Sequence, residues 1–235
     1  MKKILYALFL CLSAGAFSSC EDETSQDHSQ ITYYISFNMA GDQEMVIPVG
    51  TPYQEPGVEA LEGEEDVTSK IVTTGTVDGN SVGVYTLTYS ATNKDGFGSS
   101  ISRTVIVCDP AVTNDISGTY TVAPGSNRYS LSNGATVAYG GYSIPVSYVA
   151  PGIFFMSDYM GGYYDQRAGY GSAYAMSGYL KLNADNTLEA LSGDVPGWGD
   201  SLDSFENGVY DPETGSVSYA LGYAGAFIFN VTLTK

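Results

Sequence analysis

The chain has 235 residues, of which 26 are acidic and nine are basic, and its formal net charge at pH 7 is −17. A chain this acidic is poorly suited to nucleic acid, whose phosphates would repel it. Hydrophobic residues make up 43% of the chain, which is enough for a packed core, while one histidine and three cysteines restrict catalytic and redox chemistry.

The N-terminal segment has the features of a secretory signal peptide. Two lysines precede an apolar run over residues 4–17, which is too short to span a bilayer as a helix. Small residues lead into Cys20, and this arrangement resembles the lipobox of bacterial lipoproteins, in which the cysteine is acylated after cleavage. The resemblance implies a signal peptide over residues 1–19 and lipidation of Cys20. The alternative is a secreted protein that is cut near Ala16.

Residues 20–30 are polar and acidic, and we expect them to form a disordered tether. Acidic residues directly after Cys20 resemble the surface-export signal of lipoproteins from Gram-negative gut anaerobes. This resemblance implies an outer-membrane protein, held by its lipid and displayed at the cell surface. A plain solvated spacer is the alternative reading, and the sequence leaves open whether the protein faces the periplasm or the exterior.

Residues 31–108 contain short β-rich runs and no amphipathic helical stretch, which predicts an all-β domain. The run 31–37 opens this domain. The runs 84–91 and 100–107 close it as a hairpin, because the connecting residues 93–98 contain an Asp-Gly turn pair.

Several motifs in this half resemble the bacterial immunoglobulin-like (Ig-like) domains of cell-surface proteins. They are Tyr-Gln-Glu-Pro-Gly-Val-Glu-Ala at 53–60, Asp-Val-Thr at 66–68, and Gly-Val-Tyr at 83–85 leading into Tyr-Ser-Ala at 89–91. The resemblance implies a β-sandwich that acts as a spacer or a presentation platform.

Residues 109–235 are rich in tyrosine and glycine, and fourteen of the twenty tyrosines lie between Tyr120 and Tyr223. Turn-forming residues at 183–186 and 211–215 predict hairpins, so we expect an antiparallel meander closed into a barrel or a sandwich. Alternation in the last strand places Phe227, Phe229, Val231 and Leu233 on one face, towards the core. The strand-like runs are 118–122, 135–139, 143–149, 153–157, 179–183, 187–191, 208–210, 216–221 and 226–233.

The whole layout resembles two-domain surface lipoproteins of unknown function that are associated with Sus-like polysaccharide-utilisation systems. The second-domain motifs that carry this resemblance are Ser-Asp-Tyr-Met-Gly-Gly-Tyr-Tyr at 157–164, Gly-Trp-Gly-Asp-Ser at 197–201, and the final strand to Lys235. The resemblance implies a location and neighbours rather than an activity.

The predicted folded domains lack the residues that most catalytic mechanisms need. The single histidine, His28, lies in the predicted tether, so neither a histidine-based triad nor a histidine metal site can form in the folded domains. Cys108 has no histidine partner and lies in an apolar strand, which predicts a buried core residue. We expect no cofactor and no metal. Carboxylates for a glycosidase remain by type at Asp158, Asp165, Asp194, Asp200 and Asp203, and calcium-binding loops at 185–186 or 194–203, although turn roles are typical of such residues.

The stretch 158–174 holds five tyrosines in seventeen residues, spaced by glycines, and we expect that they cannot all belong to the core. Flat amphipathic rings can stack on sugar faces while polar neighbours bond hydroxyls. The alternative is that the rings cover the barrel mouth, with Arg167 paired to a carboxylate. The candidate ligand-binding residues are Tyr159, Tyr163, Tyr164, Asp165, Arg167, Tyr170, Trp198 and Asp200.

The sequence therefore predicts a non-catalytic surface lipoprotein that binds a polysaccharide or oligosaccharide through aromatic loops of its second domain. A structural or adhesive protein that binds another outer-membrane protein is the alternative function. A glycoside hydrolase is a remoter one, and nucleic acid is not expected as a partner.

Overall fold

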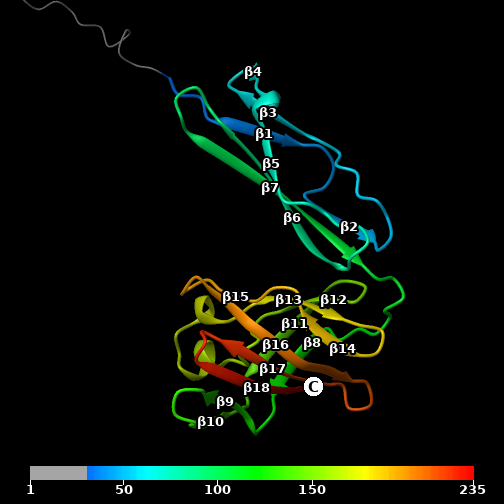
Figure 1. Cartoon of the computed structure of the whole chain (residues 1–235), viewed down its shortest axis with the longest axis vertical. Coiled ribbons are helices and arrows are strands. Elements are labelled where there is room, and N and C mark those ends of the chain that lie inside the picture. The colour runs from blue at the N-terminus through cyan, green and yellow to red at the C-terminus, as the bar shows by residue number, and fades with distance from the viewer. Residues whose placement is uncertain (1–30) are drawn as a thin grey trace, which may run out of the picture.

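The computed structural model describes residues 31–235, and in it two β domains follow one another along the long axis of the molecule (Figure 1). The predicted signal peptide, the tether and the lipidation site at Cys20 lie outside the described residues. Within the described residues, every helix is too short or too polar to cross a membrane.

The N-terminal domain is a sandwich of two small sheets. One sheet has the order β1-β3-β4 and the other has the order β2-β7-β6-β5, with β2 parallel to β7 and all other pairs antiparallel. The predicted hairpin is confirmed, since β6 pairs with β7 from Gly83 opposite Val107 to Thr92 opposite Gly98. The strands are β1 (Ile35–Met39), β2 (Glu44–Pro48), β3 (Val58–Glu62), β4 (Glu65–Asp66), β5 (Val72–Thr74), β6 (Gly83–Thr92) and β7 (Gly98–Cys108), with a 3-10 turn, η2 (Thr68–Lys70), after β4.

The apolar core between these sheets is small, formed by Ile35, Ala60, Val67 and Ala91. The same domain also buries a charged side chain, since Arg103 in β7 is 0% exposed. Burying an unpaired guanidinium is costly, so the local structure must supply partners.

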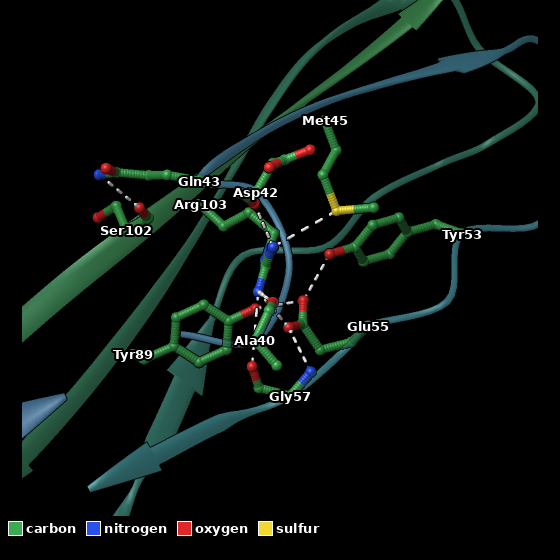
Figure 2. Close-up of polar contacts among 10 residues, drawn as sticks. All are labelled: Ala40, Asp42, Gln43, Met45, Tyr53, Glu55, Gly57, Tyr89, Ser102 and Arg103. Atoms are coloured by element: carbon green, nitrogen blue, oxygen red, sulfur yellow. Dashed lines mark hydrogen bonds and ion pairs between the residues drawn. The ribbon is translucent and has the colours of Figure 1, made fainter. Parts of the chain in front are cut away.

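Those partners come from the chain crossing between β1 and β2 and from the Tyr-Gln-Glu-Pro-Gly motif (Figure 2). Arg103 Nη2 donates to the carbonyl of Ala40 at 2.7 Å and pairs with Glu55 Oε1 at 3.1 Å. Its Nη1 donates to the carbonyl of Asp42 and lies 3.4 Å from the Met45 sulfur. One side chain thereby ties two connecting segments to β7.

Glu55 is itself held by three donors. The hydroxyls of Tyr53 and Tyr89 each donate to Oε2 at 2.5 Å, and the Gly57 N–H donates to Oε1 at 3.0 Å. Burial acts to raise the pKa of this carboxyl, but these hydrogen bonds and Arg103 outweigh it, so the Glu55 pKa lies below its usual value.

The C-terminal domain is an eight-stranded antiparallel barrel. Its strands follow the order β8-β11-β12-β13-β14-β16-β17-β18, and the barrel closes where β18 pairs with β8 through Leu233 opposite Val122. Closure removes the free sheet edges. Strands β9, β10 and β15 of this domain lie outside the closed barrel. The strands of the domain are β8 (Gly118–Val122), β9 (Ser126–Ser130), β10 (Thr136–Tyr139), β11 (Ser143–Ala150), β12 (Ile153–Met156), β13 (Gly178–Leu182), β14 (Thr187–Ala190), β15 (Asp194–Val195), β16 (Asp200–Asp211), β17 (Ser216–Tyr223) and β18 (Phe227–Thr234).

Alternating side chains fill the barrel. In β17 every second residue from Val217 to Tyr223 is buried, and the predicted inward face of β18 is confirmed, with Phe229, Val231 and Leu233 buried and Phe227 partly so. Three elements of this domain differ from expectation. Strand β9, whose sequence Ser-Asn-Arg-Tyr-Ser is polar, and the two-residue strand β15 were not predicted, and β16 is much longer than the predicted run 208–210.

The two domains meet through an apolar cluster of Ile106, Cys108, Ala150 and Ile153. Cys108 is a buried free thiol, as predicted, and burial raises its pKa above the usual value. The strand β7 thus ends directly on the β11–β12 turn of the barrel.

Candidate functional site

One end of the barrel gathers the tyrosine-rich segment and the tryptophan. The segment 157–177 connects β12 to β13 at this end, and it contains a π-helical turn, η3 (Tyr163–Arg167), and a 3-10 turn, η4 (Ser172–Tyr174). The loop around Trp198 reaches the same end, because the Gly197 N–H donates to the carbonyl of Ala173 at 2.7 Å.

The segment is anchored by Asp158, which is almost fully buried. Its Oδ1 accepts the N–H groups of Met160 at 2.8 Å and Met176 at 3.1 Å, and its Oδ2 accepts that of Gly162 at 2.8 Å. Burial raises the pKa of this carboxyl to about 6, although the three N–H groups act in the opposite direction. Asp158 therefore closes the base of the segment and offers no oxygen to a ligand.

Two glycines allow the segment to pack this tightly. Gly162 has a positive φ of 74°, and a Cβ placed there would lie 2.8 Å from the Tyr142 Cβ. A Cβ on Gly197 would lie 2.7 Å from the Tyr174 ring and 2.8 Å from the Ala173 carbonyl oxygen. Close packing therefore explains Gly162 and Gly197, whereas Gly199 has open space around it and a positive φ of 72°.

Trp198 is the centre of an exposed aromatic cluster. Its ring centroid lies 4.8 Å from that of Tyr174, 4.9 Å from that of Tyr164 and 6.1 Å from that of Tyr170. The side chains of Trp198 and Tyr170 are 41% and 57% exposed, and Tyr164 and Tyr174 are half-buried. Tyr170, Tyr174 and Trp198 line an open hollow of about 320 Å³, which we call the aromatic hollow.

Two of the predicted ligand-binding tyrosines are core residues, and the prediction is corrected for them. Tyr159 is 0% exposed and Tyr163 is 5% exposed. The Tyr159 hydroxyl donates to the carbonyl of Tyr179 at 2.8 Å, while the Tyr163 ring packs 5.1 Å from that of Tyr139 and 5.5 Å from that of Phe229. These rings fill the mouth of the barrel and present no face to a ligand.

The predicted polar residues lie around the aromatic cluster without joining into one constellation. Asp200 is exposed and accepts the hydroxyl of Tyr223 at 2.9 Å. Asp165 is half-buried, and Arg167 is exposed, with its guanidinium carbon 4.9 Å from the centre of the Tyr163 ring. The described residues provide no carboxylate within ion-pair distance of Arg167.

Sequence reasoning missed two neighbours of this cluster. Tyr223 ends β17 beneath Trp198, with 6.3 Å between the ring centroids. Arg128 lies on the unpredicted strand β9, and its guanidinium carbon is 4.8 Å from the centre of the Tyr163 ring. Tyr223 lies two residues beyond the predicted run 216–221 but continues its alternation, and no local pattern indicated Arg128.

The turn interpretation is supported for the Asp185 loop. Asp185 Oδ1 accepts from the backbone N–H of Thr187 at 3.0 Å and from its hydroxyl at 2.6 Å, which closes the β13–β14 hairpin. Over residues 31–235, no three acidic, histidine or cysteine side chains gather as metal ligands would.

Comparison with known proteins places both halves of the chain. The bacterial surface protein Ig-like domain model matches residues 37–107, and a family model that describes a C-terminal domain matches residues 109–235. The crystal structure of the lipoprotein BT2262 from Bacteroides thetaiotaomicron is 43% identical, covering 86% of this chain and 100% of that one, with a TM-score of 0.49.

More distant structures share 16% identity. They include a carbohydrate-binding module, CBM51-2, in complex with GlcNAc, with INT domains of Clostridium perfringens ZmpB (TM-score 0.28, covering 52% of this chain and 29% of that one). A Bacteroides ovatus protein of unknown function has a TM-score of 0.30, covering 65% and 57%. At these scores the likeness carries no information on function. No curated protein matches the sequence.

The 43% identity extends over the whole of BT2262, and the C-terminal model alone spans more than half of this chain. The chain therefore belongs to the same family as the lipoprotein BT2262, with a bacterial surface Ig-like domain followed by the family's C-terminal β-barrel domain.

Proposed function

We propose that this protein is a non-catalytic lipoprotein of the outer membrane, anchored at Cys20 and displayed at the cell surface, that binds carbohydrate at the aromatic hollow. The single observation that carries the proposal is that the exposed Tyr170 and Trp198 line one open hollow together with the half-buried Tyr174. Exposed rings that face a common space are suited to stacking on sugar faces, and their polar tips can bond hydroxyl groups.

The hollow is also built to keep its shape, which favours binding. Trp198 is positioned by the hydrogen bond from Gly197 to Ala173, and the segment beneath it is fixed by Asp158. A preformed site loses little conformational entropy when a ligand arrives. Loops on a rigid β scaffold commonly carry binding sites.

Isothermal titration against a panel of polysaccharides and oligosaccharides tests this proposal. For a glycan that binds, Trp198→Ala and Tyr170→Ala should each weaken the affinity by about tenfold or more, because aromatic stacking is lost. Tyr148→Ala is the matched control, since Tyr148 is an exposed tyrosine of strand β11 that does not line the hollow. If Trp198→Ala and Tyr170→Ala bind the glycan as tightly as the Tyr148→Ala control does, the hollow is not the binding site.

The same panel separates the other functional classes. Release of reducing ends would indicate a glycoside hydrolase and overturn the non-catalytic assignment. A stoichiometric protein recovered from outer-membrane extract, with no glycan binding in the titrations, would instead favour the adhesive alternative. Acylation of Cys20 is tested separately by mass spectrometry of the membrane fraction and by its loss in Cys20→Ala.

A further inference from the structure

Two arginines approach one buried tyrosine at the edge of the aromatic cluster. The guanidinium carbons of Arg128 and Arg167 lie 4.8 and 4.9 Å from the centre of the Tyr163 ring. Arg128 is half-buried and also lies 4.4 Å from the centre of the Phe227 ring. Of the four basic residues in 109–235, two are therefore concentrated at the rim that carries the aromatic hollow.

Neither arginine has an anionic partner within the described part of the chain. The ion pairs found there join Lys70 to Glu62, Arg103 to Glu55, and Lys181 to Glu189. The Arg128 Nε is enclosed and makes no hydrogen bond with any described residue. Acidic residues outnumber basic ones 26 to nine, so unpaired arginines in this chain do not reflect a shortage of carboxylates.

Stacking on rings accounts for only part of what a guanidinium needs. A cation over an aromatic face is attracted to it, but its N–H groups lie in the guanidinium plane and still require acceptors. In Arg103 of the N-terminal domain the Nε also lacks a partner, but both terminal nitrogens are bonded, Nη1 to a backbone carbonyl and Nη2 to a carboxylate and a backbone carbonyl. Arg167 is exposed and makes no ion pair with a described residue, so its N–H groups can reach an external acceptor, and in Arg128 the terminal nitrogens rather than the enclosed Nε would do so.

The arginines are connected to the aromatic hollow through Tyr164. Its ring lies 5.0 Å from that of Tyr163 and 4.9 Å from that of Trp198. Burial raises the Tyr164 pKa, and the guanidinium of Arg128, which lies over the adjacent Tyr163 ring, acts to lower it. A ligand with its sugar ring on Trp198 and Tyr170 would extend across Tyr164 towards the guanidinium groups.

We propose, on the basis of the proposed function, that the site selects saccharides bearing a carboxylate or sulfate group, with that group bound by Arg167 and Arg128. Guanidinium groups recognise these anions through paired, charge-assisted hydrogen bonds. The chain's large negative charge repels densely charged polyanions. The ligand that fits is therefore a glycan with isolated acidic groups among neutral sugars.

Matched sugars test this selectivity directly. Wild-type protein is titrated with a uronate-containing oligosaccharide, with the same oligosaccharide after reduction of its carboxyl groups, and with a sulfated oligosaccharide of equal length. The acidic forms should bind about tenfold more tightly than the reduced form, as expected for hydrogen bonds to a charged group. The uronate and sulfate arms show which anion is preferred.

Arg167→Gln is the primary variant, because Arg167 is exposed and its removal leaves the core intact. In this variant the affinities for the acidic and the reduced sugar should differ by no more than about twofold, and the affinity for the reduced sugar should be unchanged. Arg128→Lys keeps the charge but not the paired donors, and should lower the preference several-fold. Lys94→Gln, an exposed charge removal in the other domain, is the control and should change nothing.

The outcomes distinguish the two proposals. Equal affinity of wild-type protein for acidic and reduced sugars overturns the acidic selectivity but leaves sugar binding at the hollow standing. An Arg167→Gln variant that loses both sugars equally also overturns it. Absence of binding to any saccharide in the panel overturns the proposed function and this inference together.

Discussion

Arg103 in the Ig-like domain and Asp158 in the barrel are both buried ionisable side chains, and they have different kinds of hydrogen-bond partner. Arg103 of the Ig-like domain pairs with a carboxylate and with backbone carbonyls, whereas Asp158 of the barrel accepts backbone N–H groups and forms no ion pair with any residue of 31–235. The apolar core of the Ig-like domain is small, while Asp158 lies at the rim of the extensive barrel core. We therefore expect the Ig-like domain to depend on its charge cluster for cohesion, whereas the carboxylate of the barrel shapes one loop.

Replacing Arg103 should produce the largest loss of stability. Arg103→Ala leaves Glu55 without its cation and opens a cavity between the sheets, so the N-terminal domain should lose about 3–5 kcal/mol. Far-UV circular dichroism during urea unfolding would report both domains, and the fluorescence of Trp198 would report the barrel alone. The Trp198 transition should stay close to its wild-type midpoint. An unchanged dichroism curve would show that the charge cluster is not needed for cohesion.

Asp158 should make the barrel less stable as the pH rises, which is the reverse of the usual effect of a carboxyl group. Its folded pKa of about 6 lies above its unfolded value, so its contribution is fully present below pH 3.8 and is lost as the pH rises to about 6. The expected loss is on the order of 2–3 kcal/mol. Urea unfolding followed by Trp198 fluorescence at several pH values from 3.5 to 7 measures it.

Asp158→Asn provides the comparison for this measurement. Other carboxylates of the barrel, such as Asp211 and Glu189, have lowered pKa values and act in the opposite direction. Only the difference between wild type and variant isolates Asp158. Parallel pH profiles for the two proteins would show that this carboxyl has the same pKa in the folded and unfolded states.

The smallest of the three effects is expected for Tyr53→Phe. This change removes one hydroxyl that donates to Glu55 and leaves the ring, so the Ig-like domain should lose about 1–2 kcal/mol. Tyr85→Phe is the control, because its hydroxyl donates to a neutral carbonyl, that of Ser81, and its loss should matter less. Equal losses of stability in the two variants would show that a hydrogen bond to Glu55 contributes no more than one to a neutral carbonyl.

The sequence allowed much of the fold to be predicted, because alternation and turn residues act locally. Strands such as β17 and β18 alternate cleanly, and their hairpins are closed by turn-forming residues. Strand β9 escaped prediction because it lies outside the closed barrel and pairs with β10 and β18, where polar side chains are tolerated.

The candidate site was only partly predictable, for a physical reason. Composition showed that residues 158–174 carry more rings than a loop needs, but it could not show which rings turn inward. Burial of Tyr159 and Tyr163 depends on the left-handed glycines and on Asp158, which reverse the chain within a few residues. Arg103 was within reach of sequence reasoning, since it shares an inward strand position with Val105 and Val107.

The joint between the domains has a consequence for how a long polymer would meet the molecule. Strand β7 ends on the β11–β12 turn, and the first described residues lie at the far tip of the Ig-like domain (Figure 1). Figure 1 shows β15 and the adjoining start of β16, between which Trp198 lies in the chain, at the side of this axis rather than beyond the barrel. A long polymer lying alongside the molecule would contact the rings of the aromatic hollow with the middle of its chain, and binding would not require a free chain end.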